Sequence, residues 1–422
     1  MKRNMKNQKM GRLSEQKYMS VLFLLCWVVY CTSYVGRLNY SSVISVMISD
    51  QVLDASGAGF ISMIYFLAYG VGQMVNGFIG DYVNPKRMIF CGLFFSGVSN
   101  MAMAVSRHFG VMTVIWGLNG YFQAMIWAPI IRIFAEMMDQ KNRINSSVNI
   151  VTSQLIGTLL AYIMSAGVLK FSKWETVFTL AAVLLVVVSI IWEIGFSKIC
   201  DHTQEKGEKK SEKEDILQKE QNSTVKTILI SSGAVFMFFP VIVHGMLKDG
   251  VTTWVPTYIE NSFQVSASFS ILLTGILPVI NLTGAYAARF IYQKVNNSIA
   301  KSVSIFFLTA TAALIVLYFG GRITPVLSAI LLSVITASML SVNTLIINIY
   351  PLRFHKYGRV SGISGFLNAL AYLGTAISTY FIGVMVEYQG WKNTILSWCA
   401  AAAAAGLACI FAIKAEKEKK FL

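Results

Sequence analysis

Long apolar runs recur along this chain, and they constrain its fold more than any other feature. A bilayer-spanning helix needs about twenty mostly apolar residues, and runs of that length follow one another from Met19 almost to the C-terminus. A secretory leader would carry a single run. The composition, 55% hydrophobic and 13% charged, also departs from the roughly one quarter of charged residues typical of soluble domains. The sequence therefore predicts an all-α protein that crosses a membrane many times.

Polar breaks between the apolar runs predict twelve transmembrane helices. They lie near residues 18–48, 57–80, 88–106, 111–138, 144–169, 174–198, 227–259, 266–293, 300–320, 325–350, 359–386 and 391–413. The long polar stretch 201–226 has little apolar surface to bury, so we expect a linker there. The predicted parts are a tail (1–17), a six-helix bundle (18–200), the linker (201–226), a second six-helix bundle (227–413) and a tail (414–422).

The positions of the basic residues predict the orientation of the chain. A formal charge of +15 would suit a nucleic-acid partner, but most of the 35 Lys and Arg residues lie in the two tails and in the loops on one side. The opposite loops hold Arg107, Lys170, Lys173, Arg322 and Lys392. Because positively charged loops stay in the cytoplasm, we expect both termini there. We expect a bacterial inner (plasma) membrane and no nucleic-acid partner.

Two cations fall inside apolar spans at corresponding places. Arg37 in the first predicted helix recurs as Lys248 in the seventh, which indicates a duplicated six-helix unit. Burying a charge in a membrane costs at least a few kcal/mol, so such residues commonly line a transport pathway. Arg37 bonding to backbone carbonyls of a neighbouring helix is the alternative. For Lys248 the alternative is neutralisation by Asp249, although neighbours on an α-helix point about a hundred degrees apart.

Two cations that face one cavity would bind a small anion. Each supplies charge-assisted hydrogen bonds, and the planar fork of Arg37 suits phosphate oxygens while Lys248 acts as a point charge. A carboxylate would also fit. Tyr30 and Tyr34 lie seven and three residues before Arg37, on the same helix face, so we expect them to line the site. An aromatic belt at the membrane interface is the alternative for these tyrosines.

Other chemistry is weakly represented in the sequence. His244 lies one turn before Lys248 and is interpreted as a packing residue, with a proton relay as the alternative. The six cysteines lie mostly in apolar runs without metal-ligand spacing and are interpreted as packing residues. We find no metal cluster, nucleophile elbow or phosphate-binding loop motif. We therefore expect no metal, no cofactor and no enzymatic activity.

A charged loop after the second predicted helix is interpreted as a conformational latch. Gly77 permits close helix approach, and Asp81 could pair with Lys86 or Arg87 or cap the next helix. The stretch from Gly77 to Arg87, which contains Asn84-Pro85, resembles the signature G-x-x-x-D-x-x-G-[RK]-[RK] of the major facilitator superfamily. Its Asn-Pro variant is typical of the organophosphate:phosphate antiporters.

Further segments strengthen the resemblance. They are Gly120–Gln123 with Trp127–Pro129 and Arg132, Trp254–Tyr258, and Tyr372–Gly374. The resemblance implies a fold of two pseudo-symmetric six-helix bundles that rock around a central site, with Arg37 and Lys248 holding phosphate. Tyr30, Tyr34 and Tyr372 would line the cavity. The chain departs from the family at Leu38, where a second basic residue is usual, and at Ser153, where glycerol-phosphate transporters have histidine.

These observations lead to three functional hypotheses. The leading one is a monomeric secondary antiporter that exchanges an organic phosphate, or a similar organic anion, for inorganic phosphate. The second is a proton- or cation-coupled transporter of another small organic anion, in which His244, Asp249 or Glu193 handles charge. The third, from another class, is a transporter-like membrane sensor of sugar phosphates.

Overall fold

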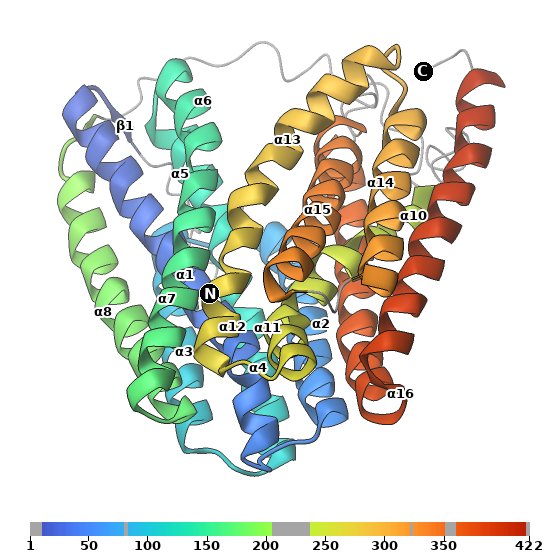
Figure 1. Ribbon diagram of the computed structural model, residues 1–422. Coiled ribbons are helices and arrows are strands. Elements are labelled where there is room, and N and C mark those ends of the chain that lie inside the picture. Colours follow the sequence, from blue (N-terminus) through green and yellow to red (C-terminus); the bar gives the residue numbers. More distant parts are fainter. Residues whose placement is uncertain (1–10, 80–82, 205–236, 321–323, 351–359, 419–422) are drawn as a thin grey trace, which may run out of the picture. The chain divides into compact units, whose positions relative to one another are not determined.

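The computed structural model describes residues 11–79, 83–204, 237–320, 324–350 and 360–418 (Figure 1). Nearly all of these residues are helical, which confirms the predicted all-α class. The first half holds β1 (Arg12–Leu13), α1 (Gln16–Ser49), α2 (Ala55–Ile79), α3 (Pro85–Val105), α4 (Phe109–Gln123), α5 (Trp127–Met137), α6 (Gln140–Asn149), α7 (Val151–Phe171), α8 (Trp174–Cys200) and β2 (Thr203–Gln204). The second half holds α10 (Phe238–Gly245), the π-helix η2 (Met246–Gly250), α11 (Val251–Phe263), α12 (Ala267–Thr274), α13 (Ile276–Lys294), α14 (Ile299–Gly320), α15 (Pro325–Asn343), the π-helix η3 (Thr344–Ile349) and α16 (Val360–Glu418).

The described helices fit twelve membrane passes. Ten segments are long and apolar enough to cross a membrane. One of them, residues 365–413, is broken at Gly390, whose φ of 74° and ψ of 174° suit glycine. Two helices therefore meet at this kink within α16, so the segment accounts for two passes. The apolar stretch Phe238–Phe263, formed by α10, η2 and α11, adds the twelfth.

Two compact units can be distinguished in the chain. Unit 1 comprises the described residues of Met1–Tyr40 and Ala68–Lys210, and unit 2 those of Ser41–Leu67 and Ser211–Leu422. The boundary passes through α1 and α2, so the last turns of α1 and the first turns of α2 group with the later helices. The bundle boundaries expected from the sequence stay a prediction.

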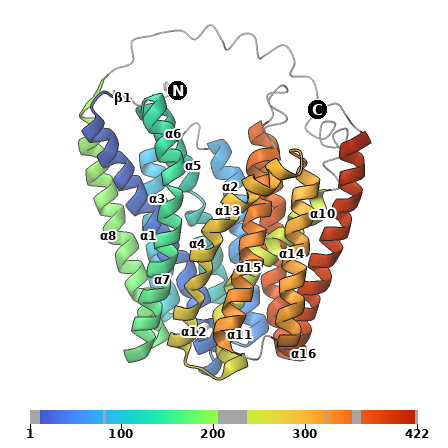
Figure 2. The same cartoon turned by 45° about the horizontal axis from the view of Figure 1, so that its top comes forward.

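Unit 1 is built on helices packed along one another. α3 packs along α8 and beside α4. Leu22 of α1, Leu93 of α3, Phe134 of α5 and Trp192 of α8 meet in one buried apolar cluster. Figure 2 shows β1 beside the end of α8, where it pairs antiparallel with β2. Side chains of the apolar runs thus supply the core of this unit.

Unit 2 packs α10 against α16, α13 against α15, and α14 against α15 and α16. It also contains the start of α2, whose first turn carries unsatisfied backbone N–H groups. Glu387 of α16 accepts from the N–H of Ser56 at 2.9 Å, and Asp54 accepts from the N–H of Gly57 at 2.7 Å. Two carboxylates therefore cap the positive end of α2.

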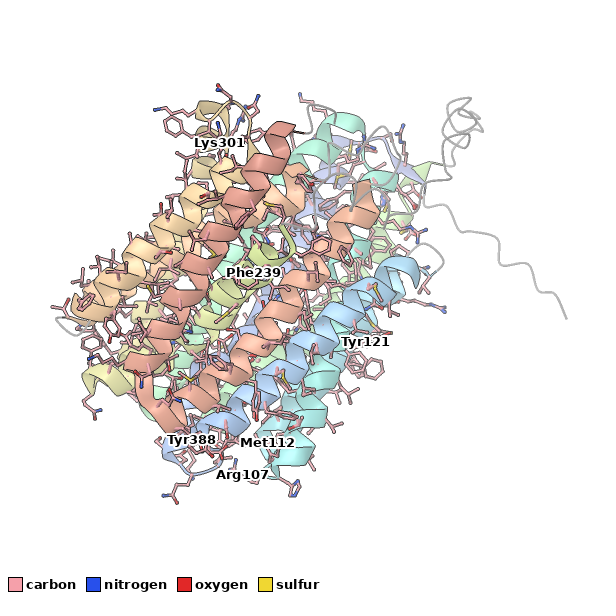
Figure 3. The ribbon with its side chains drawn as sticks, turned by 90° about the vertical axis from the view of Figure 1, so that its right-hand side faces the viewer. Arg107, Met112, Tyr121, Phe239, Lys301 and Tyr388 are labelled. Carbon is pink, nitrogen blue, oxygen red and sulfur yellow. The ribbon has the colours of Figure 1, made fainter. Side chains whose placement is uncertain are left out.

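Large apolar side chains remain on the surface of both units. Leu24 and Ile163 of unit 1 are 59% and 58% exposed, and Phe239 and Tyr388 of unit 2 (Figure 3) are 47% and 75% exposed. Soluble monomers rarely present apolar surface on this scale. The helices thus present apolar side chains to lipid, as an integral membrane protein requires.

Candidate anion-binding site

Arg37 lies among aromatic rings in unit 1. Its guanidinium carbon Cζ lies 5.6 Å from the ring centre of Tyr34 on the same helix. The rings of Tyr30 and Tyr34 meet edge to face, with centres 5.4 Å apart. The structure thus brings together the three side chains of α1 that the helical spacing placed on one face. A cation over tyrosine rings gains electrostatic stabilisation that partly offsets its desolvation.

Two further aromatic residues join this face, and sequence reasoning did not single either out as a site residue. Tyr69 of α2 has its ring centre 4.8 Å from Arg37 Cζ, and its hydroxyl accepts from Gln73 Nε2 at 3.0 Å. Trp127 of α5 lies 4.8 Å from Tyr30 between ring centres. Trp127 lies in a segment that carries the family resemblance, whereas Tyr69 has no local sequence signal beyond an aromatic residue in an apolar run. Each reaches Arg37 or Tyr30 through helix packing.

Lys248 lies in the π turn η2 of unit 2 and contacts its neighbour in sequence. Its Nζ donates to both carboxylate oxygens of Asp249 at 3.1 Å. This contact corrects the expectation that helical neighbours do not face one another. The segment is a π turn and not a regular α-helix, and a long lysine side chain can fold back on itself. π turns occur frequently at functional sites.

The turn that carries Lys248 is held by side chains of α16. Thr375 Oγ1 donates to the carbonyl of Gly245 at 3.0 Å, and Ser378 Oγ donates to that of Met246 at 3.2 Å. A side chain on Gly245 would collide with the carbonyl of Ala371, so only glycine allows the two helices to approach this closely. Backbone carbonyls beside the π turn are thereby satisfied from a neighbouring helix.

His244 and Tyr372 flank this region of unit 2. His244 is 2% exposed, and its Nε2 has no hydrogen-bond partner among the residues that the structure describes. Tyr372 is half-buried on α16, one residue after Ala371. Since Arg37 belongs to unit 1 and Lys248 to unit 2, the shared chamber of the two cations stays a prediction.

The proposed latch is partly visible. Gly77 lies in the last turns of α2, and Asp81 lies outside the described residues. Arg87 is exposed. Lys86 forms an ion pair with Glu193 of α8 at 2.6 Å. The α3 helix is capped by Asn84, whose side chain accepts from the N–H of Lys86 at 2.9 Å. Lys86 therefore connects the start of α3 to α8 within unit 1.

Arg132 of α5 also lies inside a predicted span (111–138), and it has structural partners. It pairs with Glu136 at 2.7 Å, one helical turn away, and donates to the carbonyl of Val83 at 3.1 Å. Its charge is thus paired within α5, and its guanidinium also bonds to the loop before α3. No group of His, Cys, Asp or Glu among the described residues is arranged to hold a metal ion.

The fold, with cations inside its membrane spans, defines an integral membrane protein of the transporter class. Residues 26–373 match the family model of the Major Facilitator Superfamily, and the chain belongs to this family. A solved bacterial homologue of the human lysosomal transporter Spinster, in an inward-facing and occupied conformation, matches with a TM-score of 0.73 and 12% identity over 97% of this chain and all (100%) of that chain. This likeness confirms the predicted fold.

Curated relatives confirm the resemblance to organophosphate transporters. A probable hexose phosphate transport protein of Chlamydia trachomatis is 20% identical over 90% of this chain and 88% of its own length. The glycerol-3-phosphate transporter of Bacillus subtilis is 21% identical over 88% and 87%. The membrane sensor protein UhpC of Salmonella typhimurium is 18% identical over 88% and 86%.

Proposed function

We propose that this protein is a secondary active transporter that exchanges an organic phosphate, such as a sugar phosphate or glycerol phosphate, for inorganic phosphate. The single observation that carries the proposal is the guanidinium of Arg37, held among tyrosine rings of unit 1 inside an apolar span. A charged side chain inside a membrane span is usually retained because it functions there, for example in a substrate pathway. The names of the relatives support phosphate esters as the solute.

The second cation completes the proposed site. Lys248 and Asp249 form an ion pair with side-chain exposures of 19% and 23%, so Lys248 remains accessible to a solute. Phosphate would bind the guanidinium of Arg37 and compete with Asp249 for Lys248. An anion that binds both cations would have a higher affinity for a conformation in which both can reach it. A ligand shifts a conformational equilibrium when its affinity differs between the two states.

The remaining features of the proposal follow from the charge pattern. Both termini lie in the cytoplasm because the basic loops and tails lie on that side. The protein acts as a monomer in a bacterial inner membrane, and its two bundles expose the site to either side alternately. Lys86 and Glu193 belong to the conformational latch, whose contacts form and break during this movement.

Exchange in proteoliposomes tests the proposal. The purified chain is reconstituted with internal phosphate, and uptake of labelled phosphate or glycerol 3-phosphate is followed. Arg37→Ala and Lys248→Ala should each abolish exchange, whereas Arg289→Ala, which removes an exposed arginine of α13, should leave it intact. Normal exchange by both site variants would refute the assignment. Uptake that collapses with a protonophore would favour proton coupling instead.

A sensor is the second candidate, favoured by the similarity to UhpC along most of the chain. A sensor binds its ligand but carries no flux. Thermal shift with phosphate and glucose 6-phosphate measures binding, and the proteoliposome experiment measures flux. Binding without exchange would select the sensor.

A further inference from the structure

A chain of buried side-chain amides in unit 1 ends on the backbone next to Arg37. Asn100 of α3 and Asn119 of α4 both donate through Nδ2 to the carbonyl oxygen of Gly36, at 3.3 and 3.2 Å. Both asparagines are fully buried. The peptide that carries this carbonyl joins Gly36 to Arg37. Two neighbouring helices therefore hold α1 by its backbone at the position of the cation.

Additional bonds orient the two asparagines. Asn39 of α1 donates to Asn100 Oδ1 at 2.6 Å, and Asn100 also donates to the carbonyl of Ser96 at 2.9 Å. The Ser96 hydroxyl donates to Asn119 Oδ1 at 2.6 Å and accepts from Gln123 Nε2 at 2.7 Å. Since each amide oxygen has its own donor, the amide nitrogens are directed to α1. A fully connected buried network of this kind has one preferred arrangement.

Polar side chains commonly hold membrane helices together, so the place of this network is the informative feature. Its acceptor is a carbonyl in the middle of α1, where regular helix bonding already uses the backbone. The bonded peptide is planar, so fixing its carbonyl also fixes the direction in which the Cα of Arg37 leaves it. A Cβ on Gly36 would also press on the end of the Leu185 side chain of α8 and lie close to Asn100 Nδ2. α1 is thus held closely at this peptide.

We propose that Asn100 and Asn119 are positioning residues for the anion site. They fix the Gly36–Arg37 peptide, and through it the guanidinium that lies over the rings of Tyr34 and Tyr69, without touching the solute. Their contribution is pre-organisation, because a side chain held in its binding geometry loses less freedom when the anion arrives. The inference rests on the proposed role of Arg37 in binding phosphate.

Variants that keep the branched shape of the side chain test this role. Asn100→Leu and Asn119→Leu remove the donors and should each raise the KM for inorganic phosphate in exchange about fivefold, as the loss of one hydrogen bond of typical strength would. The kcat should change less than the KM. Ser189→Ala is the matched control, because this buried hydroxyl of α8 bonds to the carbonyl of Val186 in its own helix. Its KM should stay unchanged.

A double-mutant cycle separates positioning from general stability. Lysine lacks the planar fork, so in an Arg37→Lys background the fivefold effect of Asn119→Leu should fall below twofold. An effect that persists in full there overturns the proposal. Should Asn119→Leu not fold, Gln123→Leu tests the network from its far end, and its KM should rise about twofold for a weakened bond. Unchanged KM values in all folded variants also overturn the proposal.

The outcomes for the positioning role and for the proposed function are distinct. Normal exchange by Arg37→Ala would refute the phosphate-binding role of Arg37 and with it the proposed function. Loss of exchange by Arg37→Ala, combined with normal KM values for the asparagine variants, would refute the positioning role alone.

Discussion

Replacing Asp249 with asparagine tests whether this carboxylate competes with the transported anion for Lys248. The lysine Nζ lies 3.1 Å from both carboxylate oxygens, and the two side chains are 19% and 23% exposed. Exposed ion pairs contribute up to about 1 kcal/mol, and breaking a fully buried pair costs about 3–5 kcal/mol. A pair of intermediate exposure should therefore contribute about 2 kcal/mol.

An anion that binds Lys248 must compete with the carboxylate of Asp249 for the lysine Nζ. Asp249→Asn retains the shape of the side chain and removes the competing charge. The contribution of the ion pair, about 2 kcal/mol, then no longer opposes binding of the anion to Lys248. Inorganic phosphate should then bind about ten- to thirtyfold more tightly. Without phosphate the variant should be less stable than the natural chain, because Lys248 loses its counter-charge. Saturating phosphate should restore the stability.

Thermal unfolding of the purified chain across a range of phosphate concentrations measures both effects. Asp50→Asn, which neutralises an exposed carboxylate just after α1, is the matched control and should behave as the natural chain. Equal or weaker phosphate binding by Asp249→Asn would show that Lys248 does not bind the anion. A loss of stability that phosphate does not restore would indicate a structural pair only.

Three further substitutions test the packing that supports the site. Thr375→Val removes the donor to the carbonyl of Gly245, just before the π turn, and should lower the free energy of unfolding by about 1 kcal/mol, whereas Thr379→Val, whose hydroxyl bonds within its own helix, should cost less. Gly374→Ala forces apart α10 and α16 and should cost about 1–3 kcal/mol; Gly365→Ala, with open space around it, should not. Lys86→Met should cost at most about 1 kcal/mol, an effect that high salt diminishes. Thermal unfolding checks all three.

Sequence reasoning succeeded where the signal is local. Apolar runs long enough to span a bilayer predicted the helices, because lipid requires that every backbone polar group be satisfied within a helix. The grouping of Tyr30, Tyr34 and Arg37 on one face follows from 3.6 residues per turn. The i, i+4 spacing of Arg132 and Glu136 likewise permits an ion pair on one helix face. The sequence does not show that the same arginine also bonds to the carbonyl of Val83.

Other features of the site depend on the path of the backbone. The contact of Lys248 with Asp249 follows from a π turn, whereas the sequence predicts a regular helix at these residues. That turn is supported by hydroxyl groups of α16, which lies far along the chain. No local pattern of residues signals such support, because a threonine in an apolar helix more often bonds to its own backbone.

The sequence by itself determined that this chain is a twelve-helix membrane protein with cations in its first and seventh spans, because hydrophobic length and charge position are properties of each segment alone. The tertiary structure decided which residues surround those cations. Tyr69 reaches Arg37 from α2, and the amides of Asn100 and Asn119 reach its backbone from α3 and α4. Such contacts depend on the rotation and depth of each helix against its neighbours, which side-chain packing sets and no single segment encodes.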